Sequence, residues 1–417
     1  MNAPAQGAQA KAAPGAAVPT FAGVTYEDAL ARARALLPVL RERAAHAEEE
    51  RVMLPETLAD LHRTGVLRVL QPRRWGGMEL DFVAYVDFSE AIARGCASTG
   101  WNVGNLLIHH WMLALYDERA QQEVWGADPE ALIASGIAYP QGSAKRVPGG
   151  LRLSGRWNFS SGVNVAGWNM LACIVRESDG HGGDKVVDHR MCLLPKSDYE
   201  IVDDWYVLGM RSTGSMTVVA KDVFVPEHRA LCMYDARGGD GFPGATGNPN
   251  PVYRVPLSAL GAHGIGGAAV GNAQAALELS VEAVKARSTS YQGLKMRDIQ
   301  TVQLRIGAAG ARIEAARQLL RANCIEAMEI ARRNVIADAP TKLRFKRDLA
   351  YAAALCTEAV DLLHAMAGAN GIYDSYPIQR IFRDAHALGA HFSFSTDAQF
   401  SAWGLAALGG ETVNPTL

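Results

Sequence analysis

The sequence has no excess of either charge, no paired cysteines and no long apolar run. Its 41 basic and 43 acidic residues leave a net charge of −2 over 417 residues, so the chain lacks the field that attracts nucleic acid or an anionic membrane. The six cysteines form no Cys-x-x-Cys pair and match no histidine spacing, which argues against a zinc site or disulfide framework. No segment approaches the roughly 20 apolar residues that span a bilayer. We therefore expect a cytoplasmic protein without a metal, membrane or nucleic acid partner.

The remaining pattern predicts a tail followed by three folded parts. Residues 1–20 are rich in Ala, Pro and Gly and read as a disordered tail. Residues 21–131 carry apolar side chains at helical spacing and predict an N-terminal α-helical domain. Short alternating runs rich in β-branched residues predict a central β domain over residues 132–236. A Gly/Pro-rich linker or mobile loop, residues 237–251, precedes a C-terminal helical part, residues 252–417, with four long helices.

Four short motifs stand out from this periodic background. They are Ala97-Ser98-Thr99-Gly100-Trp101; residues 154–162, Ser-Gly-Arg-Trp-Asn-Phe-Ser-Ser-Gly; residues 208–215 around Arg211; and a late run with Gly371-Ile372-Tyr373, Arg383-Asp384-Ala385 and His391-Phe392. In this order they resemble the acyl-CoA dehydrogenase flavoproteins. The resemblance implies an α+β fold with an N-terminal helical domain, a central β-barrel-like domain and a C-terminal four-helix bundle.

The catalytic carboxylate of that family is missing from this chain. Counting from Arg383-Asp384-Ala385, the residue at its position is Phe392, which cannot remove a proton from carbon. Some family members place the base at the start of the C-terminal bundle instead, but no Asp or Glu lies between Asp240 and Glu278. Asp384 and Asp397 lie too far along the chain from Phe392 to replace it. Both usual dehydrogenase bases are therefore absent.

The motifs are similar, more narrowly, to the two-component flavin-dependent monooxygenases of the same fold. This branch includes the oxygenase components of 4-hydroxyphenylacetate 3-hydroxylase and the seco-steroid phenol hydroxylase. It implies that a separate NAD(P)H:flavin reductase supplies reduced FMN or FADH2, which reacts with O2 to a C4a-hydroperoxyflavin that hydroxylates an aromatic, phenolic substrate. A homotetramer is implied too. No Gly-x-Gly-x-x-Gly follows a predicted strand, so no nicotinamide site is expected here.

The resemblance also implies roles for individual residues. Ser160 would contact the flavin N5 edge, and His391 would be the acid or base that handles the phenol proton. An unperturbed phenol has a pKa of about 10 and a histidine one of about 6.5, a gap worth roughly 5 kcal/mol, so proton loss must be assisted or accompany oxygen transfer. The substrate pocket would include Trp101, His109, Ser135 and Phe392, and the flavin would also meet Ser161, Arg211, Arg254 and Arg287.

Several alternatives stay open from the sequence. His109 is equally well explained by packing, because His110 beside it leaves the helix register open. Arg287 is one residue farther from Tyr291 than the corresponding Arg and Phe of the family, which favours a transiently bound flavin over a tightly held FAD. Sister activities would oxygenate a heteroatom or a heterocycle such as indole or thiophene. A true acyl-CoA dehydrogenase with a relocated base, or a non-catalytic scaffold, would share the fold.

Overall fold

The computed structural model describes residues 20–178, 183–289 and 293–411. The predicted tail, residues 1–20, lies outside this range except for its last residue. The first layer is helical, and its α-helices are α1 (Tyr26–Ala35), α2 (Leu37–Glu50), α3 (Pro55–Thr64), α4 (Ala84–Ala93), α5 (Ala97–Leu113) and α6 (Glu118–Val124). Nearly every residue of α5 is buried, as expected of a helix that is apolar on all sides and runs through a core.

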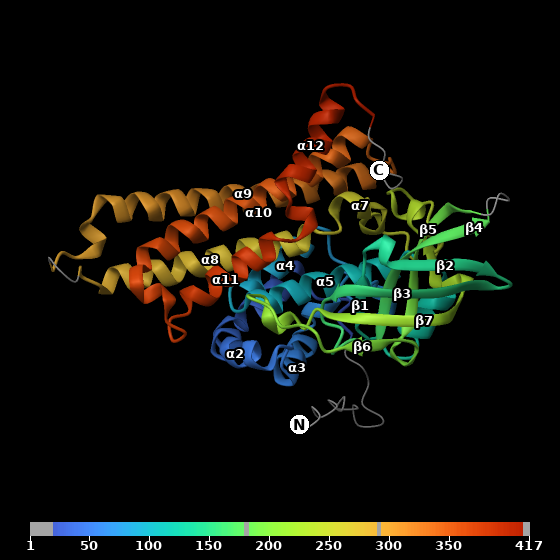
Figure 1. Ribbon diagram of the computed structural model, residues 1–417, viewed down its shortest axis with the longest axis horizontal. Coiled ribbons are helices and arrows are strands. Elements are labelled where there is room, and N and C mark those ends of the chain that lie inside the picture. The colour runs from blue at the N-terminus through green and yellow to red at the C-terminus, as the bar shows by residue number, and fades with distance from the viewer. Residues whose placement is uncertain (1–19, 179–182, 290–292, 412–417) are drawn as a thin grey trace.

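A single mixed sheet follows this helical layer. Its strands are β1 (Ile133–Gly136), β2 (Gly142–Val147), β3 (Gly150–Ser160), β4 (Trp168–Ser178), β5 (Asp184–Pro195), β6 (Glu200–Val202), β7 (Met216–Pro226) and β8 (Ala230–Cys232). The order is β6-β7-β3-β2-β4-β5-β8, with β1 parallel to β4 beside this path. The sheet lies at one end of the molecule, against α5 (Figure 1). Among the described residues the path ends at β6 and β8, so the barrel is open.

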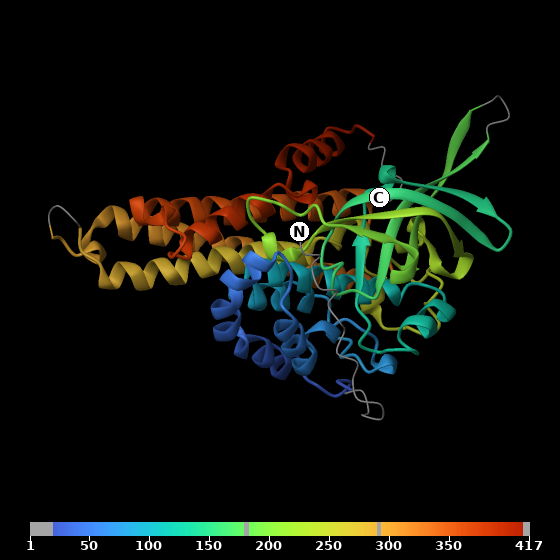
Figure 2. The same ribbon diagram turned by 60° about the horizontal axis from the view of Figure 1, so that its bottom comes forward.

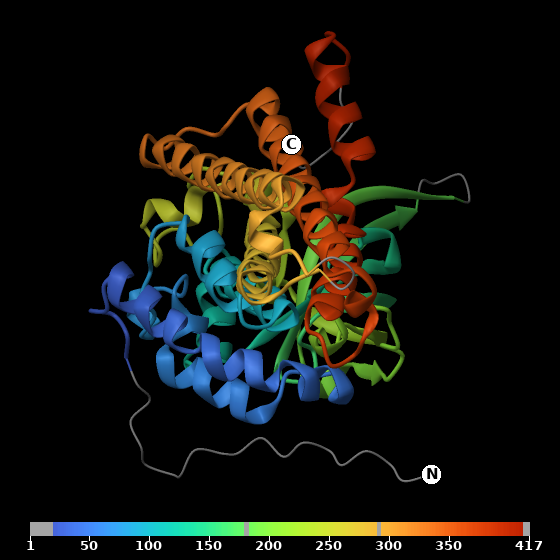
Figure 3. The same cartoon turned by 90° about the vertical axis from the view of Figure 1, so that its left-hand side faces the viewer.

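The C-terminal part is a helical bundle. It consists of α7 (Leu257–Leu260), α8 (His263–Ala286), α9 (Gln300–Arg332), α10 (Ala339–Ala367), α11 (Ile378–Gly389) and α12 (Thr396–Ala407). The four helices α8 to α11 run alongside one another (Figures 2 and 3). The last helix, α12, stands away from this bundle and contacts it through α10. The stretch Ala339–Ile372 is long and apolar enough to cross a membrane, but 56% of its most apolar window is buried inside the protein. It is a core helix of the bundle.

The Gly/Pro-rich segment, residues 237–251, is fastened to the protein. The side-chain amide of Asn248 donates to the Ala114 carbonyl at 2.7 Å, and the Gly244 N–H donates to the Leu115 carbonyl at 3.0 Å. A Cβ on Gly244 would lie 2.3 Å from the Ala114 carbonyl oxygen, so only glycine permits this approach. The expected linker or mobile loop is therefore a strap across the end of α5.

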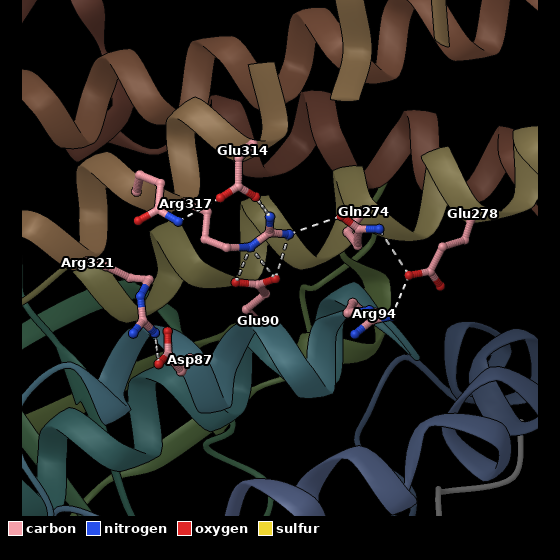
Figure 4. Close-up of polar contacts among 9 residues, drawn as sticks. Asp87, Glu90, Arg94, Gln274, Glu278, Glu314, Arg317 and Arg321 are labelled. Atoms are coloured by element: carbon pink, nitrogen blue, oxygen red, sulfur yellow. Dashed lines mark hydrogen bonds and ion pairs between the residues drawn. The ribbon is translucent and has the colours of Figure 1, made fainter. Parts of the chain in front are cut away.

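Partly buried ion pairs join the N-terminal helices to the bundle (Figure 4). Arg317 on α9 pairs with Glu90 on α4 at 2.9 Å and donates to Gln274 on α8 at 3.0 Å. One turn farther along α9, Arg321 pairs with Asp87 of α4. Burial raises the pKa of the Glu90 carboxyl, and Arg317 opposes that increase. These contacts hold α4 against α8 and α9. They also help to position α5, because α5 follows α4 directly in the chain.

Candidate active site

Trp101 is the centre of a cluster formed by α5, the end of β3 and the segment after α11. Its indole N–H donates to the Ser161 hydroxyl at 3.0 Å. Its ring meets the His391 imidazole edge to face, with 5.4 Å between ring centroids, and the Phe394 ring at 6.3 Å. The structure therefore brings together three residues predicted from the sequence, Trp101, Ser161 and His391.

A short chain of hydroxyl hydrogen bonds continues from Ser161, and its end on a carbonyl determines which hydroxyl donates at each step. Ser161 and Ser215 hydroxyls lie 2.8 Å apart, Ser215 and Thr213 hydroxyls 2.7 Å apart, and Thr213 donates to the Met210 carbonyl at 2.8 Å. A carbonyl can only accept, and each hydroxyl has one proton. Ser215 must then donate to Thr213, and Ser161 to Ser215. The Trp101 N–H begins this chain and the Met210 carbonyl ends it.

The loop that carries Met210 is clamped by α11. The Met210 N–H donates to the Asp384 carboxylate at 2.6 Å, and the Arg383 guanidinium donates to the Leu208 carbonyl at 2.7 Å. Met210 adopts φ of 56°, and a Cβ on Gly209 would lie 2.3 Å from the Arg383 carbonyl oxygen. Burial raises the pKa of Asp384 to about 6, although the hydrogen bond from the Met210 N–H offsets part of this increase. The Arg383-Asp384 motif thus positions the loop instead of supplying a base.

His391 is neutral at pH 7 and has a defined tautomer. Burial lowers its pKa to about 4. Its Nδ1 accepts from the Ser393 N–H at 3.2 Å, so the proton of the neutral ring is on Nε2. The neighbouring Phe392, predicted as a pocket wall, is 72% exposed, while Phe394 is 4% exposed and packs on Trp101 and His391. Within one chain, Phe394 is therefore the ring of this segment that packs against Trp101 and His391.

His109 has the opposite tautomer. Its Nδ1 lies 2.6 Å from the Ile133 carbonyl on β1, so Nδ1 carries the proton and Nε2 keeps its lone pair without a hydrogen-bond partner in the described chain. Burial lowers the pKa of His109 to about 4, and the Ile133 carbonyl raises it by a smaller amount. His110 instead accepts from the Trp125 indole N–H at 3.1 Å. The structure therefore resolves the helix register that the sequence left open. His109 contacts β1 at Ile133, and the buried Ser135 lies two residues farther along the same strand.

Groups that fit a flavin occur at the end of β3. Phe159 has φ of 67° at an irregularity in the β3–β7 pairing, and its 68% exposed ring meets the Trp205 ring edge to face at 6.0 Å. Positive φ is strained for a bulky residue, and such strained residues cluster at active sites and ligand contacts. The adjacent Ser160 hydroxyl is buried, and its proton has no acceptor among the described residues. The Nε of Arg211 is buried without a partner. An apolar ring surface, a free hydroxyl proton and an unpaired guanidinium N–H suit an isoalloxazine.

Two predicted flavin contacts lie elsewhere in the chain. Arg254 donates to the Pro249 carbonyl at 3.0 Å, so its guanidinium is bound to the strap. Arg287 is the C-cap of α8, which has 24 residues and is therefore about 36 Å long. The C-terminal end of this helix lies at the end of the bundle away from the sheet (Figure 1). Tyr291, whose spacing from Arg287 was compared with that of the family, lies outside the described residues. Within one chain, Arg287 does not meet the Trp101 cluster.

Two other kinds of site can be compared with this cluster, a surface hollow and a metal centre. A hollow of about 520 Å³ lies against β6 and β7 and is lined by residues such as Lys221 and Phe224, away from the Trp101 cluster. Among residues 20–178, 183–289 and 293–411, no three His, Cys, Asp or Glu side chains gather as a metal site. The Trp101 cluster is therefore the candidate active site.

Comparison with known proteins agrees with this geometry. Models of the acyl-CoA dehydrogenase N-terminal and C-terminal domains match residues 30–128 and 263–396. The oxygenase subunit HsaA of a flavin-dependent monooxygenase from Mycobacterium tuberculosis is 36% identical over 370 residues, 88% of this chain and 92% of the relative. The oxygenase component of an FADH2-dependent resorcinol hydroxylase from Rhizobium sp. is 32% identical over 389 residues, 91% of this chain and 94% of the relative.

Solved structures give the same result. The crystal structure of 3-HSA hydroxylase from Rhodococcus sp. RHA1 matches with a TM-score of 0.87 and 34% identity, covering 94% of this chain and 99% of that one. The fold and flavin dependence expected from the motifs are thereby confirmed. The chain belongs to the acyl-CoA dehydrogenase family and, within it, to the oxygenase components of the flavin-dependent monooxygenases.

Proposed function

We propose that this oxygenase component hydroxylates a phenol, with reduced FMN or FADH2 and O2 as co-substrates. The observation that carries the proposal is the buried contact between Trp101 and a neutral His391, in the segment where a dehydrogenase would need a carboxylate. A neutral imidazole can form a hydrogen bond to a phenol oxygen without placing a charge beside an aromatic ring. The names of the relatives, which act on resorcinol and 3-HSA, support this substrate class.

The flavin would be held by residues around the end of β3. The Ser160 hydroxyl would meet the N5 edge, the Phe159 ring would cover an apolar face, and the unpaired Nε of Arg211 would donate to a flavin oxygen. Ser161 is less suited to donate to the flavin, because its proton is committed to Ser215. When bound, the reduced flavin activates O2 and supplies the oxygen atom. The protein residues contribute orientation and exclude water, which would otherwise divert the oxygen to hydrogen peroxide.

The two histidines would divide the proton chemistry. Nε2 of His109 has a free lone pair and would accept a hydrogen bond from the phenol, whereas Nε2–H of His391 would donate one. A histidine with a pKa of about 4 lies about 6 units below a phenol, which corresponds to roughly 8 kcal/mol for complete proton transfer. Ionisation before the reaction is therefore unfavourable. Proton loss would accompany oxygen transfer, with Ser135 and Trp101 positioning the ring.

The assembly would consist of several copies and a separate reductase. The relatives are oxygenase components of two-component systems, so a distinct NAD(P)H:flavin reductase provides the reduced flavin. We propose a cytoplasmic homotetramer. Apolar side chains exposed on α9 and α12, such as Leu304, Phe400 and Leu405, support burial against further copies, and Arg254 and Arg287 would then reach a flavin held mainly by another copy.

The test uses the full-length protein with a flavin reductase, NADH and a panel of phenols, with catechol-type products identified by mass spectrometry. We expect an ortho-hydroxylated product from at least one phenol, and a loss of about 100-fold in kcat for His109→Ala. Indole and dibenzothiophene form a second panel. Oxygenation of only these heterocycles would contradict the phenol assignment, and bleaching of oxidised FAD by an acyl-CoA would favour a dehydrogenase.

A further inference from the structure

The adjacent serines Ser160 and Ser161 differ in the state of their protons. The Ser161 proton is directed to Ser215, because the chain from Trp101 ends on a carbonyl. The Ser160 hydroxyl instead accepts a hydrogen bond from the side-chain amide of Asn169 at 3.0 Å, and its own proton has no acceptor in the described chain. Only one of the two serines therefore has a proton to offer.

Asn169 is a buried amide that belongs to none of the sequence motifs. It lies on β4 between Ala134 of β1 and Leu194 of β5, and it is completely buried. Its Nδ2 donates to Ser160, while its Oδ1 is buried without a hydrogen-bond partner of normal geometry. A buried polar atom left in this state costs stability, so its retention calls for an explanation.

The Tyr199 side chain interacts with the same amide. Burial raises the pKa of Tyr199, and hydrogen bonding to Asn169 opposes that increase. The tyrosine hydroxyl, like Oδ1 of Asn169, is buried without a hydrogen-bond partner of normal geometry. The 3.0 Å contact between Nδ2 and the Ser160 hydroxyl defines the amide orientation, with Nδ2 as the donor.

We propose that Asn169 is a positioning residue that sets the hydrogen-bonding state of Ser160 toward the flavin. The proposal rests on the proposed placement of Ser160 at N5. A serine hydroxyl has one proton and two lone pairs. Asn169 fills one lone pair, so the proton remains for the N5 of oxidised flavin and the second lone pair remains for the N5–H of reduced flavin. The same donation polarises the serine and strengthens it as a donor.

Asn169→Asp separates this role from simple packing, because it preserves shape and replaces a donor with an acceptor. An ionised Asp at position 169 would accept a hydrogen bond from the Ser160 hydroxyl, so that this proton would no longer be directed to the flavin. Oxidised flavin, which needs a donor at N5, should then bind roughly tenfold more weakly, as expected for the loss of one hydrogen bond. Reduced flavin, which needs an acceptor, should bind with unchanged affinity. Burial should raise the pKa of the new carboxyl, so lowering the pH should restore the donor and the binding of oxidised flavin.

The experiment measures the Kd of oxidised and reduced FMN anaerobically across pH, together with thermal stability and the hydrogen peroxide released per O2. Asn169→Leu removes the donor without adding a charge and should increase peroxide release. Asn323→Leu, a buried amide on α9 that faces His263, is the control for loss of a buried polar side chain. Ser160→Ala completes a double-mutant cycle, in which Asn169→Leu should add no further effect to Ser160→Ala.

The outcomes separate the two proposals. A pH-dependent ratio of the two affinities in Asn169→Asp, with non-additive effects of Asn169→Leu and Ser160→Ala, supports the inference. If Ser160→Ala weakens flavin binding but both Asn169 variants bind flavin and release hydrogen peroxide like the wild type, the positioning role is wrong while the flavin site stands. If the wild type binds neither flavin state, or Ser160→Ala changes nothing, the placement of Ser160 fails and the inference fails with it.

Discussion

Asp384→Asn tests whether the clamp between α11 and the Met210 loop contains a carboxylate that is costly to ionise. The amide oxygen of Asn can still accept from the Met210 N–H, which now bonds Asp384 at 2.6 Å. Burial raises the pKa of Asp384 from 3.8 to about 6. The folded state therefore binds its proton more tightly than the unfolded state, and stability falls as the pH rises from about 3.8 to about 6.

The size of the effect follows from the shift. About 2.2 pKa units correspond to roughly 3 kcal/mol of destabilisation when Asp384 is fully ionised. At about pH 7.5 nearly all of this penalty is present, and at about pH 4.5 about 1 kcal/mol remains. The stability of the variant relative to the wild type should then decrease by about 2 kcal/mol from the higher to the lower pH.

The assay is urea unfolding at the two pH values and at fixed protein concentration. Glu329→Gln, an exposed carboxylate on α9, is the matched control and should give the same difference from wild type at both. Hydrogen exchange of the Met210 amide reports the clamp directly. A pH-independent difference for Asp384→Asn would refute the buried, hard-to-ionise carboxylate.

Three further substitutions test the packing around the site. Arg317→Leu leaves Glu90 buried without its partner and should destabilise by about 3 to 5 kcal/mol in urea; a loss below about 1 kcal/mol would mean that the pair is solvated. Thr213→Val removes the acceptor of the Ser215 proton and should cost about 1 to 3 kcal/mol, measured as a thermal shift; an unchanged midpoint would contradict the assigned proton directions. Phe394→Ala should cost about 3 to 5 kcal/mol and raise the substrate KM, whereas the exposed Phe392 should tolerate alanine; equal effects would place both rings in the pocket.

Most helices and strands could be predicted from periodicity, because their apolar spacing is strong. The run of apolar and β-branched residues at 216–226 coincides with β7 (Met216–Pro226), and the helical period ending at residue 333 matches α9 (Gln300–Arg332) within a residue at its C-terminal end. The strap was not predictable in the same way. Five glycines in a short segment indicate flexibility, yet Gly244 is required for close packing on Ala114.

The site could be predicted in part. Trp101, Ser161 and His391 were found through motifs, and the structure brings them into contact. The motif does not show that Phe392 and Phe394 differ in environment, because a short helical turn (Phe392–Phe394) directs one ring inward and the other outward.

Asn169 was not found either, because its role depends on a hydrogen bond between neighbouring parts of the sheet. The proton positions on the two histidines likewise follow from backbone contacts, with Ile133 for His109 and Ser393 for His391.

The most direct measurement of oxygenase chemistry is transfer of isotope from ¹⁸O₂. The protein would be mixed anaerobically with reduced flavin and a phenol, exposed to ¹⁸O₂ and quenched, and the product mass determined. We predict one ¹⁸O atom in each hydroxylated product and unlabelled product when H₂¹⁸O is used instead. A product oxygen derived from water, or peroxide formation without any product from the whole phenol panel, would contradict the proposed function.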